Sequence, residues 1–334
     1  MQSIELGKFG VENLKLVERP QPKAGPGQVV VRMRAAAVNY RDFLIAQGYY
    51  KQDLPLPLVP LSDGAGEVAE VGSGVLSVAA GDRVSSVFFQ AWDSGPASLP
   101  KISVSTGCEA PGVLAQYAVL PEQAIVPIPA GMNFSEAAAL PCAGVTAWNA
   151  LSTGKCKAGD TVLVLGTGGV ALCALQLAKA MGAKVILTSG SDEKLKRATS
   201  LGADQVINYK LDPEWGKTAF GMAGLGVNIV VESGGAGTLA QSIAALGWDG
   251  HIAYVGSLTG FSAELNLLGL VGKNAHLHGL TVGSRQHHRE MLAFVARHGI
   301  KPVLDDQRTL EEGGAAIQAI AAGQHFGKIV IRIP

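Results

Sequence analysis

The pattern of apolar and polar positions divides the chain into an early part of short strands and a middle part in which strands and helices alternate. In the early part, residues 29–38 (VVVRMRAAAV) read as a strand. Residues 64–75 alternate apolar and polar side chains up to a Gly-Ser-Gly turn, and residues 79–88 supply another turn and strand. Short strands at this spacing predict a small barrel or sandwich rather than an α/β layer.

After about residue 130 the pattern changes to continuous apolar strands separated by helices. The predicted strands are residues 161–166, 183–189, 204–209, 227–233 and 251–257, and the predicted helices are residues 171–182, 192–202 and 237–247. Apolar strands that alternate with helices indicate a doubly wound parallel sheet covered on both faces. The predicted fold class is therefore α/β, with a separate β-rich domain before it.

These changes of pattern predict three segments. We expect a β-rich domain over residues 1–130 and a doubly wound α/β domain over residues 131–283. The last segment, residues 284–334, contains two helical patterns and a closing strand, FGKIVIRIP.

Composition narrows the classes of function. The 334 residues carry 27 basic and 27 acidic side chains, so charge gives no reason to expect nucleic acid or an anionic membrane as partner. No apolar run is long enough to span a bilayer, and the first residues lack a signal-peptide pattern, so a cytoplasmic protein is expected. The four cysteines are scattered without a CxxC pair, which favours neither disulfides nor a zinc knot.

A glycine-rich turn, GTGGVA, follows the strand at 161–166 and opens the next helix. Gly166 is predicted to make the tight turn, and Gly168 to let a pyrophosphate approach the backbone. Gly169 and Val170 begin the helix, whose N–H groups would bind the phosphates, and Ala171 allows close packing. This context makes the turn a strong signal for a dinucleotide.

The end of the next strand indicates which dinucleotide it is. An acidic residue that would bind the adenosine ribose is expected about 20 residues after the turn, but the sequence there is Thr188, Ser189 and Gly190. Ser189 can donate a hydrogen bond, Gly190 leaves room, and Lys194 follows one helical turn later. Asp192 is expected to cap the helix instead. The missing acid predicts NADP(H).

With these features in view, the whole chain resembles the medium-chain dehydrogenase/reductase superfamily, and within it the zinc-free members similar to quinone oxidoreductases. The resemblance is carried by VNYRD (38–42), GAGEVAEVGSGV (64–75), GDRV (81–84), LPCAGVTAW (140–148), GTGGVA (166–171), LGADQVINY (201–209) and HFGKIVI (325–331). It implies a GroES-like catalytic domain, a Rossmann domain, an active-site cleft between them and a C-terminal segment that returns to the first domain.

The resemblance also shows a departure at the metal positions. Zinc-dependent members bind the catalytic metal with Cys, His and Cys. Here the first position is Asn39, the second falls on Ser62 and Asp63, and only Cys142 remains. The lobe that carries four cysteines in those enzymes has only Cys108. One thiolate cannot replace three protein ligands, so no metal site is expected.

The same resemblance nominates residues for catalysis. Tyr40 is the first candidate for hydrogen bonding to substrate or for proton donation, with a packed tyrosine as the alternative. Asn39 is a candidate for orienting substrate or nicotinamide. Asp42 is a candidate for fixing the local geometry, or it merely holds a turn. Arg41 is expected at the surface or in an ion pair.

For the cofactor, the resemblance implies a set of residues from several loops. Besides the glycine turn, Ser189, Gly190 and Lys194, the set contains Thr146, Tyr209, Val255, Gly256, Ser257, Val282, Gly283, Ser284 and Lys328. Lys328 is a candidate for a phosphate contact, with a surface lysine as the alternative.

The leading hypothesis is an NADPH-dependent, zinc-independent reductase of quinones or conjugated enone and enoyl substrates. The alternatives are an alcohol or aldehyde dehydrogenase without the usual zinc site, and a non-enzymatic NADP(H)-binding redox sensor or structural partner. The resemblance implies a homodimer, with residues 251–257 and 265–272 at the edge of the Rossmann sheet. The histidines show no ligand spacing with a carboxylate or thiol, and His287 and His288 are expected to be solvated.

Overall fold

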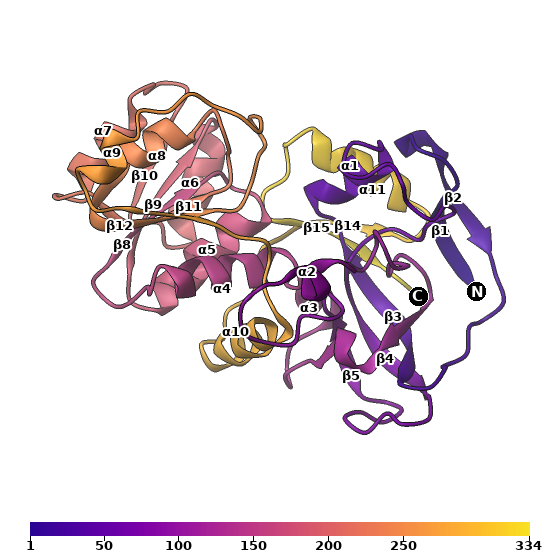
Figure 1. Ribbon diagram of the computed structural model, residues 1–334. Helices are drawn as coiled ribbons and strands as arrows, with labels where there is room; N and C mark the ends of the chain where they lie inside the picture. Colours follow the sequence, from indigo (N-terminus) through magenta and orange to yellow (C-terminus); the bar gives the residue numbers. More distant parts are fainter. The chain divides into compact units, whose positions relative to one another are not determined.

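The computed structural model describes all 334 residues and divides them into two compact units. Unit 1 comprises residues 1–145 and 283–334, and unit 2 comprises residues 146–282. The boundary expected at residue 130 thus falls at residue 145. The C-terminal segment belongs to unit 1, so both chain termini lie in that unit (Figure 1).

Unit 1 is built on a seven-stranded sheet in the order β14-β15-β3-β4-β5-β7, with β6 paired to β3. Its strands are β3 (Gln28–Ala37), β4 (Asp63–Val71), β5 (Arg83–Ser86), β6 (Tyr117–Pro121), β7 (Ile125–Pro127), β14 (Leu304–Thr309) and β15 (Lys328–Arg332). A separate antiparallel pair consists of β1 (Gln2–Leu6) and β2 (Leu14–Glu18). The central strand β3 pairs with β4, β6 and β15, which joins the C-terminal strand to the N-terminal sheet.

Helices are few and short in unit 1. They are α1 (Tyr40–Ala46), α2 (Leu99–Ile102), α3 (Phe134–Ala138), α10 (Arg285–Arg297) and α11 (Gly313–Ala321), with 3₁₀ turns at Val11–Asn13 and Glu122–Ala124. Apolar side chains of β3, β4 and β15 form one core with Ile317 and Ile320 of α11. The last segment therefore completes this core, which explains why it folds with the first unit.

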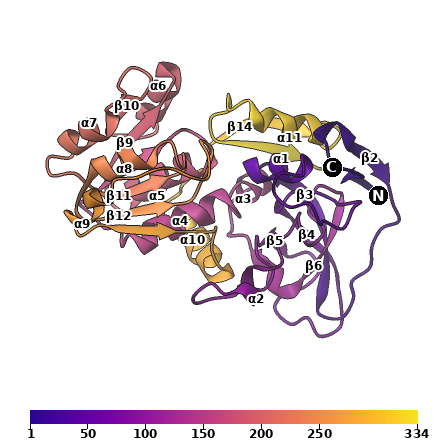
Figure 2. The same cartoon turned by 45° about the horizontal axis from the view of Figure 1, so that its top comes forward.

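Unit 2 is a six-stranded parallel sheet in the order β10-β9-β8-β11-β12-β13. The strands are β8 (Thr161–Leu165), β9 (Lys184–Ser189), β10 (Gln205–Asn208), β11 (Val227–Glu232), β12 (Leu246–Tyr254) and β13 (His276–Gly279). The helices are α5 (Gly169–Ala180), α6 (Asp192–Ser200), α7 (Trp215–Met222), α8 (Leu239–Ala245) and α9 (Leu268–Val271); α4 (Ala143–Thr153) leads into the unit. Figure 2 shows these helices around the sheet.

Successive residues of these strands are buried on opposite faces of the sheet, which explains the continuous apolar runs. Leu163 and Ile186 join a core with α7 and α8. Their neighbours Val162 and Val185 are equally buried and face the other side. The predicted doubly wound sheet is confirmed.

The edge of this sheet differs from the expectation. We expected residues 251–257 at the edge, but β12 pairs with both β11 and β13, so the edge strand is β13. Residues 265–272 form no strand; they contain the short helix α9. The histidines of β13 interrupt the apolar pattern by which the other strands were found.

One of the two histidines at the start of α10 also differs from the expectation. His288 is buried, and burial lowers the pKa of its imidazole to about 3. It faces the core with Met291, Leu292 and Val295, the other buried residues of α10. The prediction of a solvated His288 was therefore wrong.

No helix combines the length and the hydropathy that a membrane span requires.

Candidate active site and cofactor site

The three residues predicted for catalysis lie at the start of α1 in unit 1. Asn39 is the N-cap residue, Tyr40 begins the helix and Asp42 occupies its third position. The Asp42 carboxylate accepts a hydrogen bond from the Asn39 backbone N–H at 2.7 Å, so it fixes the first turn. Tyr40 is 39% exposed and its ring contacts Phe43 at 6.3 Å between centroids.

A buried ammonium group holds Asn39 in place. Lys328 Nζ donates to Val38 O at 2.8 Å and to Asn39 Oδ1 at 2.5 Å, and lies 3.6 Å from Asp63 Oδ2. Lys328 is only 3% exposed, so the alternative of a surface lysine is wrong. Its predicted contact with a cofactor phosphate stays a prediction.

The same contact determines the orientation of the Asn39 amide. Since an ammonium group can only donate, the oxygen of the amide must face Lys328, and Nδ2 faces away. Asn39 Nδ2 is buried and has no hydrogen-bond partner. A buried donor without an acceptor is costly, and at functional sites a bound ligand often satisfies it.

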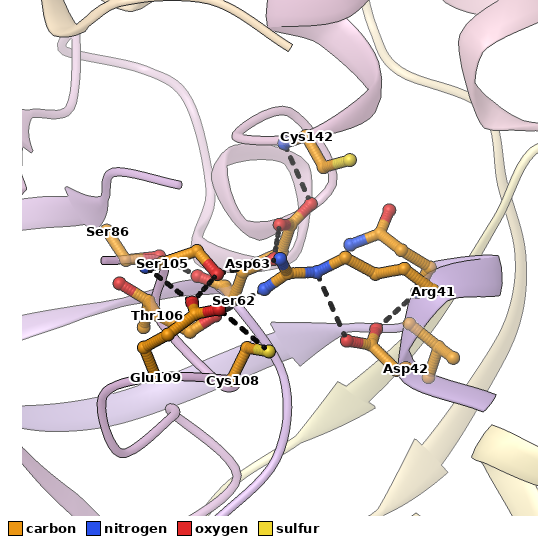
Figure 3. Close-up of polar contacts among 12 residues, drawn as sticks. Arg41, Asp42, Ser62, Asp63, Ser86, Ser105, Thr106, Cys108, Glu109 and Cys142 are labelled. Carbon is orange, nitrogen blue, oxygen red and sulfur yellow. Dashed lines mark hydrogen bonds and ion pairs between the residues drawn. The ribbon is translucent and has the colours of Figure 1, made fainter. Parts of the chain in front are cut away.

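Asp63 is the anionic centre of this site (Figure 3). It accepts from Ser62 Oγ at 2.6 Å and from the backbone N–H of Cys142 at 3.0 Å, and it is fully buried. Burial first, and the charge of Asp63 second, raise the pKa of the Cys142 thiol to about 12. The thiol therefore stays protonated at neutral pH.

These residues do not fit a catalytic zinc ion. A zinc site needs deprotonated thiolate, neutral imidazole or carboxylate ligands, usually three from the protein. Here the Asn39 oxygen accepts from an ammonium group, and Cys142 is the single thiol among these residues. Both oxygens of Asp63 already accept hydrogen bonds. The Lys328 ammonium group lies 3.6 Å from Asp63 Oδ2, so the carboxylate charge that could balance a metal cation is already balanced by lysine.

Arg41 ties the lobe at residues 104–112 to α1. Its guanidinium donates to Ser105 Oγ at 3.1 Å and to Thr106 O, and it stacks on the Phe88 ring at 3.8 Å. Ser105 Oγ in turn donates to Glu109 at 2.7 Å (Figure 3). Arg41 is 9% exposed, so the expected surface position is wrong, although its weak ion pair with Asp42 at 3.8 Å agrees with the other expectation.

This network occupies the lobe where zinc-dependent members carry four cysteines. Cys108 is buried there, and burial together with Glu109 raises the pKa of its thiol to about 11. Hydrogen bonds from Arg41 to Ser105 and Thr106, and from Ser105 to Glu109, therefore hold this lobe together. No sequence pattern indicated this network, because Arg41 lies more than sixty residues from Ser105 and Thr106.

Asp42 predicts a pH dependence of stability. Burial raises the pKa of its carboxyl to about 6 from 3.8, against the opposing effect of Arg41. The folded state then binds this proton more tightly than the unfolded state. The stabilisation by this bound proton is complete below pH 4 and is lost as pH rises through 6. The difference of about two units between the folded and unfolded pKa values corresponds to about 3 kcal/mol of the free energy of unfolding.

We therefore expect Asp42→Asn to remove this loss, so that the stability of the variant relative to wild type increases between pH 4 and pH 7. Urea unfolding at several pH values measures it. The exposed Asp53→Asn is the control and should follow the wild-type profile. Parallel curves for Asp42→Asn and wild type would contradict the assignment.

The glycine turn in unit 2 has the geometry of a dinucleotide site. Gly166 follows β8 with φ +84°, and a Cβ added there would meet no atom within 4 Å. Its N–H donates to Thr188 O at 2.9 Å, which places the turn beside the end of β9. Gly168 is the N-cap of the twelve-residue helix α5, and Gly169 and Val170 form its first turn. The open space beside Gly166, in the turn that leads into α5, suits the approach of a pyrophosphate.

The end of β9 carries the residues predicted to select the nucleotide. Ser189 ends the strand, and Gly190 follows it beside two side chains of the next loop. A Cβ added at Gly190 would lie 2.8 Å from Tyr209 Oη and 2.8 Å from Lys210 Cε. Tyr209 was predicted from the sequence and Lys210 was not, although a basic residue directly after the next predicted strand was an available signal.

The N-cap of α6 differs from the expectation. Ser191, not Asp192, caps the helix by accepting from the Lys194 backbone N–H. The Asp192 carboxylate accepts from Asn208 Nδ2 at 2.6 Å. The acid is therefore hydrogen-bonded through one oxygen to the end of the neighbouring strand β10.

The other predicted cofactor residues are distributed over both units. Thr146 lies in α4, Val255, Gly256 and Ser257 follow β12, and Val282 ends unit 2; Gly283, Ser284 and Lys328 belong to unit 1. Within unit 2, Ser233 Oγ donates to Leu165 O at 2.8 Å, and Gly256 lies against Ser233. The carboxyl ends of β8, β11 and β12 therefore meet, as the sheet order requires.

Comparison with known proteins decides the family. The chain is 42% identical to a zinc-type alcohol dehydrogenase-like protein of Schizosaccharomyces pombe over 97% of this chain and 96% of that protein. The chain belongs to the medium-chain dehydrogenase/reductase superfamily. The alcohol dehydrogenase GroES-like domain family matches residues 25–130, and the zinc-binding dehydrogenase family matches residues 169–297. The second match includes none of the four positions Asn39, Ser62, Asp63 and Cys142.

Other members of this superfamily differ in their described reactions. A quinone oxidoreductase-like protein 2 homolog of Nematostella vectensis is 31% identical over 97% of this chain and 84% of its own length. The crystal structure of a candidate alcohol dehydrogenase of Sinorhizobium meliloti 1021 is 40% identical, with a TM-score of 0.93 over 99% of this chain and 98% of that chain. This chain is an oxidoreductase of the same fold, with a GroES-like and a Rossmann unit.

Solved members bind either nicotinamide cofactor. An NAD-dependent alcohol dehydrogenase is 33% identical, with a TM-score of 0.91 over 100% of both chains. A mycobacterial protein complexed with NADPH is 27% identical, with a TM-score of 0.83 over 99% of both chains. A nicotinamide cofactor is thus common to the fold.

Proposed function

We propose that this oxidoreductase uses NADPH to reduce quinones or conjugated enone and enoyl carbonyl compounds without a catalytic zinc ion. The observation that carries the proposal is the Lys328 ammonium group, which donates to Asn39 and lies 3.6 Å from Asp63. It supplies positive charge among the very residues that would otherwise ligate zinc. The quinone oxidoreductase-like relative supports the same class of substrate.

The chemistry of the substrate follows from the missing Lewis acid. Zinc contributes several kcal/mol by stabilising the oxygen on which charge develops. Quinones and conjugated carbonyls delocalise that charge themselves, so hydrogen-bond donors are sufficient. We assign Asn39 Nδ2 as such a donor, because it is buried and has no partner in the protein. The exposed Tyr40 hydroxyl is the proposed proton donor.

The cofactor side of the proposal rests on the end of β9. A bound nicotinamide dinucleotide supplies the hydride. Ser189 and Gly190 stand where an acid would bind ribose hydroxyls, and Lys210 lies against Gly190. Lys194 follows in α6. A hydroxyl donor and two lysines suit a 2′-phosphate, so NADPH is the proposed cofactor.

One alternative has a specific observation in its favour. Several relatives, including the solved NAD-dependent enzyme, are alcohol dehydrogenases, so an alcohol or aldehyde dehydrogenase acting through other groups remains the second candidate. The two candidates differ in their acceptors. A saturated aldehyde cannot delocalise charge as a conjugated one does.

The test is NADPH oxidation with a quinone, a conjugated enone and a saturated aldehyde in parallel, with NADH beside each. We expect turnover of the first two with NADPH and at most slow reduction of the aldehyde. Preferred reduction of the aldehyde would overturn the substrate class. Equal rates with NADH would overturn only the cofactor assignment.

We also propose, from the resemblance, that the protein is a homodimer. Apart from the second copy, the proposed binding partner is the small-molecule substrate. The exposed edge strand β13 is available for pairing with a second copy. Analytical ultracentrifugation tests this, and a monomer at micromolar concentration would contradict it.

A further inference from the structure

Three histidines gather on the two outermost strands of the unit 2 sheet. His251 lies on β12, and His276 and His278 lie on β13. His251 is the register partner of His276, and His278 follows two residues later. Since side chains two residues apart share a face of a strand, all three imidazoles project from the same face.

The three rings are close enough to share one ion. Their ligand nitrogens lie within 4.8 Å of one another. His251 Nδ1 is 3.2 Å from His278 Nε2, and the rings of His251 and His276 stack at 4.4 Å between centroids. In a tetrahedral zinc site with bonds of 2.0–2.1 Å, neighbouring ligand nitrogens are about 3.3 Å apart.

One pair therefore already has the separation of metal ligands. The third, His276, is exposed, so its ring can turn toward an ion without displacing a core side chain. The register between β12 and β13 places the three Cβ atoms on one face of the strand pair. The rings are stacked, and coordination requires only rotation of side chains.

We propose that His251, His276 and His278 form a site for a divalent transition-metal ion of the imidazole-preferring class, Zn²⁺ first, with water as the fourth ligand. Imidazole is a ligand that Zn²⁺, Cu²⁺ and Ni²⁺ favour, and three protein ligands with one open position are a common zinc arrangement. The site is independent of Asn39, Asp63 and Cys142 and of the proposed reaction.

The ion would fasten the edge strand to the sheet. β13 has four residues, pairs only with β12 and is largely exposed, so little apolar burial holds it. A ligand that binds the paired strands better than the separated ones stabilises the pairing by mass action. The site is thus a metal clip for the edge of the nucleotide-binding unit.

The test uses untagged protein stripped with a chelator and titrated with Zn²⁺ in a calorimeter. We expect one ion per chain in wild type and an affinity at least about tenfold weaker in His276→Gln and His278→Gln. His298→Gln, which removes an exposed histidine of unit 1, is the matched control and should bind as wild type does.

A second readout is independent of affinity. Hydrogen exchange of the backbone amides of residues 277–279 should slow when Zn²⁺ is added to wild type and stay unchanged in His276→Gln. The proposal is overturned if wild type binds no ion, or if His276→Gln and His278→Gln bind as tightly as His298→Gln.

Discussion

Replacement of Gly190 by Asp is expected to lower kcat/KM for NADPH by about 100- to 1000-fold while kcat/KM for NADH is retained or rises. The substitution places a carboxylate at the end of β9, where a ribose-binding acid is otherwise found. Two unit charges 4 Å apart interact by about 4 kcal/mol at an effective dielectric constant of 20, which corresponds to roughly a thousandfold. An ion pair between the new carboxylate and Lys210 would weaken this repulsion, which is why the lower limit of the expected loss is 100-fold.

The matched control is Gly190→Asn, which adds the same bulk without the charge. An added side chain meets the flexible ends of Tyr209 and Lys210 rather than backbone, so both variants should fold. We expect Gly190→Asn to lower kcat/KM for both cofactors by a similar, smaller factor. If the Asp and Asn variants lose NADPH and NADH activity alike, the phosphate does not bind at this position.

Replacement of Lys328 by Met is expected to destabilise the protein by about 3–5 kcal/mol, the usual cost of breaking a buried ion pair from one side. The substitution leaves the Asp63 carboxylate buried with only the Ser62 hydroxyl and the Cys142 N–H as partners. It also removes the donor that orients the Asn39 amide. Denaturant unfolding of the purified variant measures the loss.

Two further variants keep this test specific. Lys301→Met removes a lysine whose ion pair with Glu136 is 63% exposed on the lysine side, and should cost less than about 1 kcal/mol. The double variant Lys328→Met with Asp63→Asn should recover part of the lost stability, because it removes the unpaired charge. Equal losses of unfolding free energy in Lys328→Met and Lys301→Met would contradict a buried ion pair between Lys328 and Asp63.

The sequence predicted the elements whose patterns are local. The runs at β8, β9 and β11 are apolar because both faces of the strands are buried, and the glycine turn at Gly166 has a positive φ that few other residues adopt. Asn39 and Asp42 were predicted because a short motif after a strand carries them, and their part in catalysis stays a prediction. Such features depend on neighbours within a few residues.

The parts that were missed depend on contacts between distant residues. Lys328 lies nearly three hundred residues from Asn39, and Arg41 more than sixty from Ser105, so neither pairing leaves a pattern in the sequence. The histidines of β12 and β13 show ligand spacing only after the strands pair. The edge strand β13 was missed because its four residues include two histidines and are largely exposed.

Zinc-free hydride transfer is tested most directly by the rate of NADPH oxidation with a conjugated enone before and after removal of metal by a chelator. Activity, rather than metal content, must be measured, because the three-histidine site, which shares no residue with the catalytic candidates, would also bind zinc. We expect the same kcat in both samples, because no zinc ion takes part in the proposed hydride transfer. Activity that is lost with the chelator and restored by added Zn²⁺ would contradict it.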